Sequence, residues 1–117
     1  MDSPVPKRLK EARFAAQISQ KKLGIAAGMD EFSASARMNH YELGRHTPDY
    51  ATLKRIADVL KVPSAYFYAE DDDLAELIKF VGNIDKQGRI RLLENMSLFL
   101  DQRDLFNGEH DGNDVNF

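Results

Sequence analysis

Apolar residues recur every three or four positions along most of the 117-residue chain, and this spacing limits the fold more than any other feature. It is the periodicity of α-helices that bury one face. No segment alternates apolar and polar residues over the length of a strand, so the sequence predicts an all-α protein. Helices are expected at about 4–16, 20–27, 30–42, 50–61, 64–68, 71–82 and 86–106, followed by a disordered acidic tail at 107–117.

Residues that start and stop helices support these boundaries. Ser19 can cap the second segment, and Gly28 can end it in a left-handed conformation. Asp30 is expected as the N-cap of the third segment, and Gly44 as its C-terminal stop.

Charge is divided unevenly along the chain, whose net charge is −3. Residues 1–68 carry 11 basic and 7 acidic side chains, a balance of +4, whereas residues 69–117 carry 5 and 12, a balance of −7. Such a division is typical either of two ordinary solvated surfaces or of a chain whose halves have different tasks, one of them nucleic-acid binding.

One block of residues carries the most specific signal. It combines a capped short helix, a small residue, a glycine turn and a Leu-Ile-Ala-Leu helix, in the order Ser19-Gln20-Lys21-Lys22-Leu23-Gly24-Ile25-Ala26-Ala27-Gly28, Met38, Tyr41-Glu42-Leu43-Gly44-Arg45, Pro48 and Leu53-Lys54-Arg55-Ile56-Ala57-Asp58-Val59-Leu60-Lys61-Val62-Pro63. Over about residues 5–68 the chain resembles the helix-turn-helix family of lambdoid phage repressors and Cro, the XRE-type transcriptional regulators. The resemblance implies a five-helix lambda-repressor-like DNA-binding domain at 1–68 and double-stranded DNA as the partner.

The third segment is the expected recognition helix. Burial of Ala34, Met38 and Tyr41 would leave its opposite side facing outward, and Gly24 would let the second segment approach it closely. Short polar and basic side chains on such a face can reach base edges in a major groove. The expected base-reading residues are Ser33, Ser35, Ala36, Arg37, Asn39 and His40.

The chain departs from the family pattern at two places. About four additional residues, 30–33, precede the core of the third segment, and because four residues make nearly one helical turn they are expected to prolong this helix at its N-terminus rather than to form a loose loop. Leu43 stands where the family usually has Asn, which in the family helps to contact the DNA backbone, so that contact is not expected here.

The family also implies an ion pair between the positions of Arg13 and Glu42, which would fix the third segment on the first. Phosphate contacts are expected from two places, the start of the second segment and the turn after the third, at Gln20, Lys21, Arg45 and His46. Lys54 and Arg55 either join these contacts or solvate their helix.

Other site chemistries find little support. The triplet at 71–73 fits the start of a helix better than a metal site, since consecutive carboxylates there point in different directions. The three histidines have no metal-binding spacing, and the absence of cysteine removes thiolate zinc sites and cysteine nucleophiles. We expect neither enzymatic activity nor a cofactor.

The second half is expected to assemble the protein. The segment at 86–106 is amphipathic, and its apolar face needs either its own domain or the same helix of a second subunit. The dimer is favoured because operators read by such proteins are usually palindromic. The region 69–106 is the expected dimerisation segment, through Ile90, Leu93, Met96, Phe99 and Leu100.

The sequence as a whole predicts a cytoplasmic transcriptional regulator, because no segment has the layout of a membrane span or of a signal peptide. It would bind a palindromic operator as a homodimer and act as a repressor. The alternative is an antitoxin-like or accessory protein whose segment 69–106 binds a protein partner.

Overall fold

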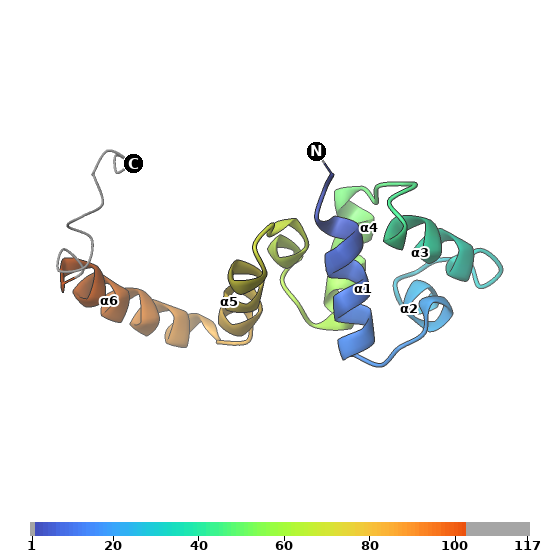
Figure 1. Ribbon diagram of the computed structural model, residues 1–117. Helices are drawn as coiled ribbons and strands as arrows, with labels where there is room; N and C mark the ends of the chain where they lie inside the picture. Colours follow the sequence, from blue (N-terminus) through green and yellow to red (C-terminus); the bar gives the residue numbers. More distant parts are fainter. Residues whose placement is uncertain (1, 103–117) are drawn as a thin grey trace. The chain divides into compact units, whose positions relative to one another are not determined.

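The computed structural model describes residues 2–102, and these are helical and contain no strand, which confirms the all-α prediction (Figure 1). The helices are α1 (Val5–Ala15), α2 (Gln20–Ala26), α3 (Ala34–Glu42), α4 (Tyr50–Leu60), the 3₁₀ helix η1 (Ser64–Tyr68), α5 (Asp72–Gly82) and α6 (Lys86–Gln102). The expected continuation of the last helix to residue 106 and the expected acidic tail lie outside the described residues.

The chain divides between Asn83 and Ile84. The residues through Asn83, with α1 to α5 and η1, form one compact unit, and α6 belongs to the other. The first unit therefore includes α5, which packs on η1.

The core of the first unit is apolar and draws on every helix within it. Leu9, Leu23, Met38, Leu53, Ile56 and Phe67 are each fully buried there. These residues come from the helical faces that the periodicity marks as apolar, so burial of one face per helix accounts for the packing.

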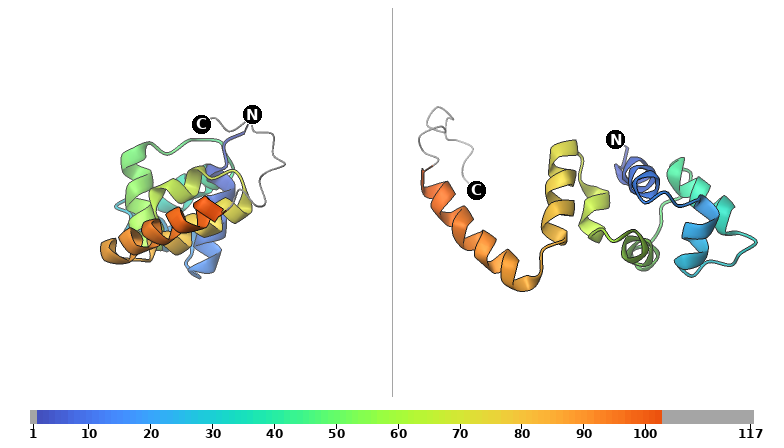
Figure 2. Two further views of the ribbon diagram at one scale, coloured as in Figure 1. Left: turned by 90° about the vertical axis from the view of Figure 1, so that its left-hand side faces the viewer. Right: turned by 90° about the horizontal axis from the view of Figure 1, so that it is seen from below.

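Helices α2 and α3 pack closely against each other (Figure 2). A Cβ atom added at Gly24 would lie 2.7 Å from the Cβ atom of Ala34, so only glycine fits this crossing without a shift. Gly28 follows with a φ of +96°, in the left-handed region that ends α2. The expected close approach at Gly24 is thus observed.

Helix α3 begins four residues later than expected, so the prediction that residues 30–33 prolong it is wrong. The carboxylate of Asp30 accepts a hydrogen bond from the backbone N–H of Phe32 at 2.9 Å, and the backbone N–H of Ser33 donates to the Asp30 carbonyl at 3.1 Å. These bonds close a turn rather than a helix. Ala34, which lies close to Gly24, is the first residue of the helix.

Arg8 ties the start of α5 to α1. Its side chain is 2% exposed and donates hydrogen bonds to the carbonyl oxygens of Ala69 and Glu70 and to the carboxylates of Glu11 and Asp72. Burial lowers the pKa of Arg8, but the hydrogen bonds to Asp72 and Glu11 outweigh it and raise that pKa above its ordinary value. The guanidinium is therefore charged, and each of its three nitrogen atoms donates at least one hydrogen bond.

Among residues 2–102, no helix has both the length and the apolar character that crossing a membrane requires.

Candidate nucleic-acid interface

The outward side of α3 is polar and solvent-exposed. Ser35, Ala36 and Arg37 are exposed, whereas Asn39 and His40 are half-buried. Ser33, expected on the same face, lies just before the helix as its N-cap residue and is half-buried. The structure therefore places five of the six expected base-reading residues on one helix and the sixth at its start.

The C-terminal end of α3 is fixed by Glu42. Arg13 of α1 donates two hydrogen bonds to this carboxylate, from Nε to Oε2 and from Nη2 to Oε1, the second at 3.0 Å. Only 12% of the Arg13 side chain and 4% of the Glu42 side chain are exposed. The structure brings the expected pair together in the form of a bidentate ion pair, the geometry that holds two groups most rigidly.

Gln20, at the start of α2, joins this arrangement. Its Nε2 donates to Glu42 Oε1 at 3.0 Å and to Asn39 Oδ1 at 3.2 Å. One amide thus links α2 to both the anchored end and the outward face of α3. The amide of Asn39 keeps its own NH₂ group as a donor for a base or a water molecule.

Two further contacts order the exposed side chains of α3. Arg37 Nη2 donates to the hydroxyl oxygen of Tyr41 at 3.2 Å. The Nδ1 atoms of His40 and His46 lie 3.4 Å apart, and the two rings meet edge to face. His46 comes from the turn after α3, so this contact joins a proposed base-reading residue to a proposed phosphate-binding one.

The other expected phosphate-binding residues are accessible. Lys21 is exposed in the first turn of α2, where the side chain of Ser19 accepts a hydrogen bond from the backbone N–H of Lys22. Arg45 is exposed after α3. A capped helix start and two exposed cations are the groups that proteins use to bind phosphate.

Lys54 and Arg55 have partners within the chain. Lys54 is paired with Asp58 at 2.7 Å, which raises the pKa of Lys54. Arg55 Nε donates to the carbonyl of Ala27 at 2.9 Å, at the C-terminal end of α2, where unpaired carbonyls favour a cation. Arg55 thus links α4 to the C-terminal end of α2.

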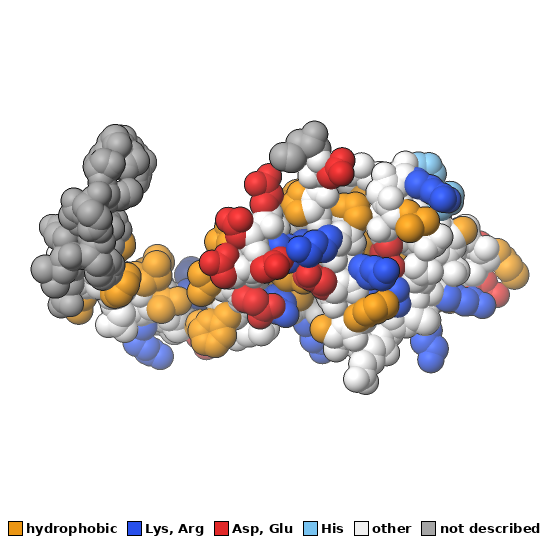
Figure 3. Space-filling model, viewed as in Figure 1, with side chains coloured by type: hydrophobic (Ala, Val, Ile, Leu, Met, Phe, Trp, Pro, Cys, Tyr) orange, Lys and Arg blue, Asp and Glu red, His pale blue; other side chains and the backbone are white. Residues whose placement is uncertain are grey.

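Acidic and basic side chains are distributed differently over the surface of the first unit. In Figure 3 acidic side chains gather over the start of α5, whereas Lys and Arg are spread over the part formed by α1 to α3. Asp71 is the N-cap residue of α5, and Asp72 and Asp73 lie in its first turn. The pKa of the Asp72 carboxyl is lowered because Lys7 and Arg8 donate hydrogen bonds to it. The acids thus lie at a helix start, as the sequence predicts, and Asp72 also forms ion pairs with Lys7 and Arg8.

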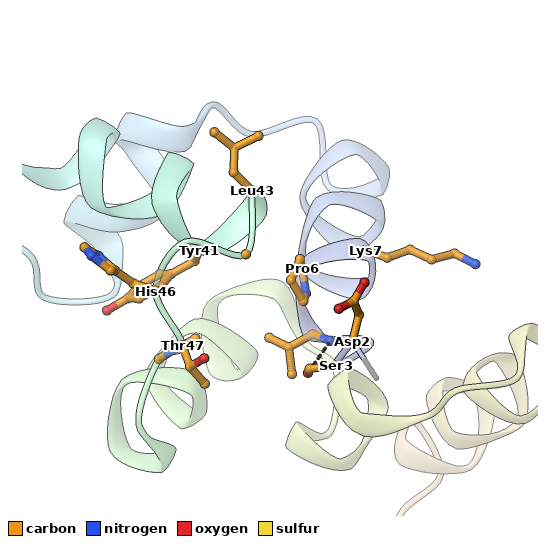
Figure 4. Close-up of a pocket in the computed structure, with 11 residues that line it drawn as sticks. Asp2, Ser3, Pro6, Lys7, Tyr41, Leu43, His46 and Thr47 are labelled. Atoms are coloured by element: carbon orange, nitrogen blue, oxygen red, sulfur yellow. Dashed lines mark hydrogen bonds between the residues drawn. The ribbon is translucent and has the colours of Figure 1, made fainter.

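A cavity of about 470 Å³ opens between the N-terminal segment and the turn after α3 (Figure 4). Its walls include Tyr41 and His46 on one side and Pro6 on the other, and Lys7 points away toward its partner Asp72. No group of three or more His, Asp or Glu side chains within residues 2–102 could hold a metal ion.

Sequence reasoning misses three of these arrangements. Arg8 lies beside the apolar stripe of α1, and a cation at such a position is a signal of a buried ion pair. Gln20 carries no signal for its bonds to Asn39 and Glu42, because they depend on how α2 crosses α3. The contact between His40 and His46 depends on the path of the turn after α3.

Comparison with solved structures identifies the family. The chain is similar to the transcriptional regulator BswR, whose crystal structure superposes with a TM-score of 0.70 at 47% sequence identity, over 84% of this chain and 93% of that one. This chain belongs to the same family of transcriptional regulators. No family model matches the chain, and no curated protein does.

Membership of this family assigns the protein a role in regulating transcription. The likeness covers 84% of the chain, so it extends beyond the 1–68 region in which the sequence motif lies. The likeness to BswR therefore covers more of this transcriptional regulator than α1 to α4 and η1.

Proposed function

We propose that this regulator binds double-stranded DNA sequence-specifically, with α3 as the recognition helix in the major groove. The observation that carries the proposal is the outward face of α3, polar and exposed, on a helix held at its end by the bidentate pair of Arg13 and Glu42. A helix that reads bases must be held rigidly while its free side chains stay accessible. Relationship to a transcriptional regulator supports the same function.

The side chains of α3 suit base edges. Arg37 can bind guanine through two donors, and Asn39 can pair with adenine. Ser33, Ser35 and His40 add hydrogen-bonding groups, and Ala36 fits a thymine methyl. Lys21, Arg45 and His46 would contact phosphates through their side chains and set the register of the helix in the groove. Gln20 would do so through its backbone N–H at the start of α2, because its side-chain amide donates to Asn39 and Glu42.

In this proposal the protein is a cytoplasmic repressor that binds a palindromic operator as a homodimer. Two recognition helices must enter major grooves about 34 Å apart, and α6 supplies the apolar positions Ile90, Leu93, Met96, Phe99 and Leu100 for a dimer contact.

Sedimentation tests this role of α6 in dimerisation. A chain ending at Asn83, which keeps the first compact unit whole, should be a monomer at micromolar concentration where the full chain is a dimer. A truncated chain that remains dimeric would remove α6 from the role.

A second function is favoured by one observation. On α5, Leu74, Leu77 and Phe80 are between 45% and 66% exposed, at positions spaced by three along one helix. Such a surface suits a protein partner of the region 69–106, as in an antitoxin-like protein. A stoichiometric partner that co-purifies from native extract, together with no DNA binding, would favour this function.

In vitro selection from a random DNA pool, at a stated salt concentration, tests the main proposal. We expect enrichment of a palindrome whose half-sites lie one helical turn apart. The Arg37→Ala variant should lose preference at one base position of each half-site, by roughly 10- to 100-fold in affinity for the correct base. Selection that enriches no sequence would overturn sequence-specific binding.

A further inference from the structure

Phe32 projects from the turn between α2 and α3 with 90% of its surface exposed. This is the largest exposed fraction among the large hydrophobic residues of the part that the structure describes, the next being Phe80 at 66%. Single exposed hydrophobic side chains are common on protein surfaces, so exposure alone assigns no role. The setting of Phe32 adds three further observations.

The turn that carries Phe32 is ordered by hydrogen bonds. Its backbone N–H donates to the carboxylate of Asp30 at 2.9 Å, and both the backbone N–H and the hydroxyl of Ser33 donate to the Asp30 carbonyl. Ala34, which follows Ser33, packs closely against Gly24. The ring is thus presented from a defined backbone position, which reduces the ordering entropy that a contact would cost.

Phe32 also lies where base contact is expected. It comes two residues before α3, and in a helix-turn-helix protein the N-terminal part of the recognition helix contacts base edges. The next exposed side chains, Ser35 and Ala36, are short. Phe32 is therefore the side chain with apolar reach at this end of the helix.

The chemistry of the ring restricts what it can recognise. A phenyl group donates and accepts no conventional hydrogen bond, and the one apolar group that base edges present in the major groove is the C5 methyl of thymine. The neighbouring carboxylate of Glu31 is repelled by phosphates but can accept a hydrogen bond from a cytosine amino group, so this turn suits base edges better than the DNA backbone.

We propose that Phe32 is a specificity-determining residue that recognises the C5 methyl group of a thymine in each operator half-site. This inference rests on the proposed function, because it requires α3 to enter the major groove. The proposal places a residue that reads sequence in the turn formed by residues 30–33, outside α3 itself.

The test removes single methyl groups from the DNA. Each thymine of one half-site of the selected operator is replaced in turn by uracil, which differs only by that methyl, and the affinity of the full-length protein is measured for each duplex. Loss of the methyl that Phe32 contacts should weaken binding about fourfold, at a thymine distinct from any that Ala36 contacts. The Phe32→Ala variant should bind that uracil-containing duplex as tightly as it binds the unmodified operator.

Two variants serve as controls. Phe32→Leu keeps an apolar side chain and should retain part of the methyl preference, whereas Tyr68→Ala removes an exposed aromatic ring from η1 and should retain all of it. An unchanged melting temperature of Phe32→Ala would show that its loss of preference is not a folding defect.

The outcomes separate the two proposals. If the operator is bound but no thymine is sensitive to loss of its methyl, or if Phe32→Ala keeps the same sensitivity, the inference about Phe32 is wrong and DNA binding stands. Such a result would favour a protein partner, rather than DNA, as the group that contacts the exposed ring of Phe32. If no DNA sequence is selected at all, the proposed function itself fails.

Discussion

Glu42 receives hydrogen bonds from side chains on two other helices, Arg13 on α1 and Gln20 on α2. The carboxylate is almost completely buried, so each bond offsets part of the cost of removing a charge from water. Such a group defines the position of its helix, because moving α3 would strand a charge. The position of α3 is thus fixed by polar contacts as well as by apolar packing.

Removing one member of the pair should be costly. We expect Arg13→Met and Glu42→Leu each to lower the free energy of unfolding by about 2–4 kcal/mol, because each leaves a buried charge without its partner. In a domain of this size the melting temperature should fall by roughly 10 °C or more. Thermal unfolding followed by circular dichroism measures it.

The double variant and a surface pair supply the comparison. Arg13→Met with Glu42→Leu should lose less than the two single losses together, since no charge is then stranded. Lys54→Met breaks the exposed pair with Asp58 and should cost at most about 0.5 kcal/mol. Single variants at Arg13 and Glu42 that melt like Lys54→Met would contradict the role of the pair.

At the scale of elements, the crossing of α2 and α3 depends on a glycine. Gly24→Ala adds a Cβ atom that would lie 2.7 Å from that of Ala34, and neither atom can swing aside. Overpacking costs about 1–3 kcal/mol, while the helix propensity of alanine returns at most about 1 kcal/mol. We therefore expect a net loss of stability from Gly24→Ala, measured by chemical denaturation.

The partner substitution tests whether this contact is the cause. Ala34→Gly removes the opposing Cβ atom, so Gly24→Ala combined with Ala34→Gly should recover about 1 kcal/mol relative to the sum of the single losses. Strictly additive losses would show that the strain at Gly24 arises elsewhere.

A second link between elements joins α1 to the start of α5. The pKa of the Asp72 carboxyl is lowered by the hydrogen bonds from Lys7 and Arg8, so its contribution to stability is present above about pH 4 and is lost as the pH falls through the lowered folded value. Asp72→Asn should therefore melt below the parent protein at pH 7. The two melting temperatures should converge as the pH is lowered from about 4 to 2.

Asp73→Asn is the matched control for this prediction. The Asp73 side chain bonds the backbone N–H of Leu74, and its replacement leaves the contacts of Asp72 with Lys7 and Arg8 in place. A gap between Asp72→Asn and the parent protein that stays constant down to pH 2 would show that the carboxylate charge is not the cause.

The sequence predicts the helices of this fold well and the start of α3 poorly. Helical periodicity marks the buried faces, and Gly28 and Gly44 mark where α2 and α3 end. Asp30 misleads because a carboxylate that accepts a backbone N–H is equally suited to an N-cap and to a turn. The contact between Ala34 and Gly24, which lie ten residues apart on two helices, is one that no local pattern predicts.

The same limit applies to the candidate site. The family resemblance indicates the pair of Arg13 and Glu42, and helical spacing indicates which side of α3 faces outward. The bonds from Gln20 to Asn39 and Glu42, by contrast, follow from the crossing angle of two helices. Local chemistry therefore predicts which residues are available, and tertiary packing determines which of them act together.

At the scale of the whole molecule, the net charge of −3 combines two unlike parts. Residues 1–68 balance to +4 and residues 69–117 to −7. Non-specific DNA binding depends on total cationic charge near phosphates, so an acidic second half should keep it weak. In the proposed function, discrimination between sequences then depends on the few side chains of α3 that would reach bases.

The salt dependence of binding separates phosphate contacts from base contacts. Each phosphate contact contributes about −0.9 to the slope of log affinity against log salt, so Lys21→Ala in both copies of a dimer should reduce that slope by about two while weakening all sequences alike. Lys79→Ala, on α5 and paired with Glu76, should leave the slope unchanged. Filter binding at several salt concentrations, on the selected operator and a scrambled duplex, gives both slopes. An unchanged slope for Lys21→Ala would exclude a phosphate contact at the start of α2, and the register of α3 would then depend on Arg45 and His46.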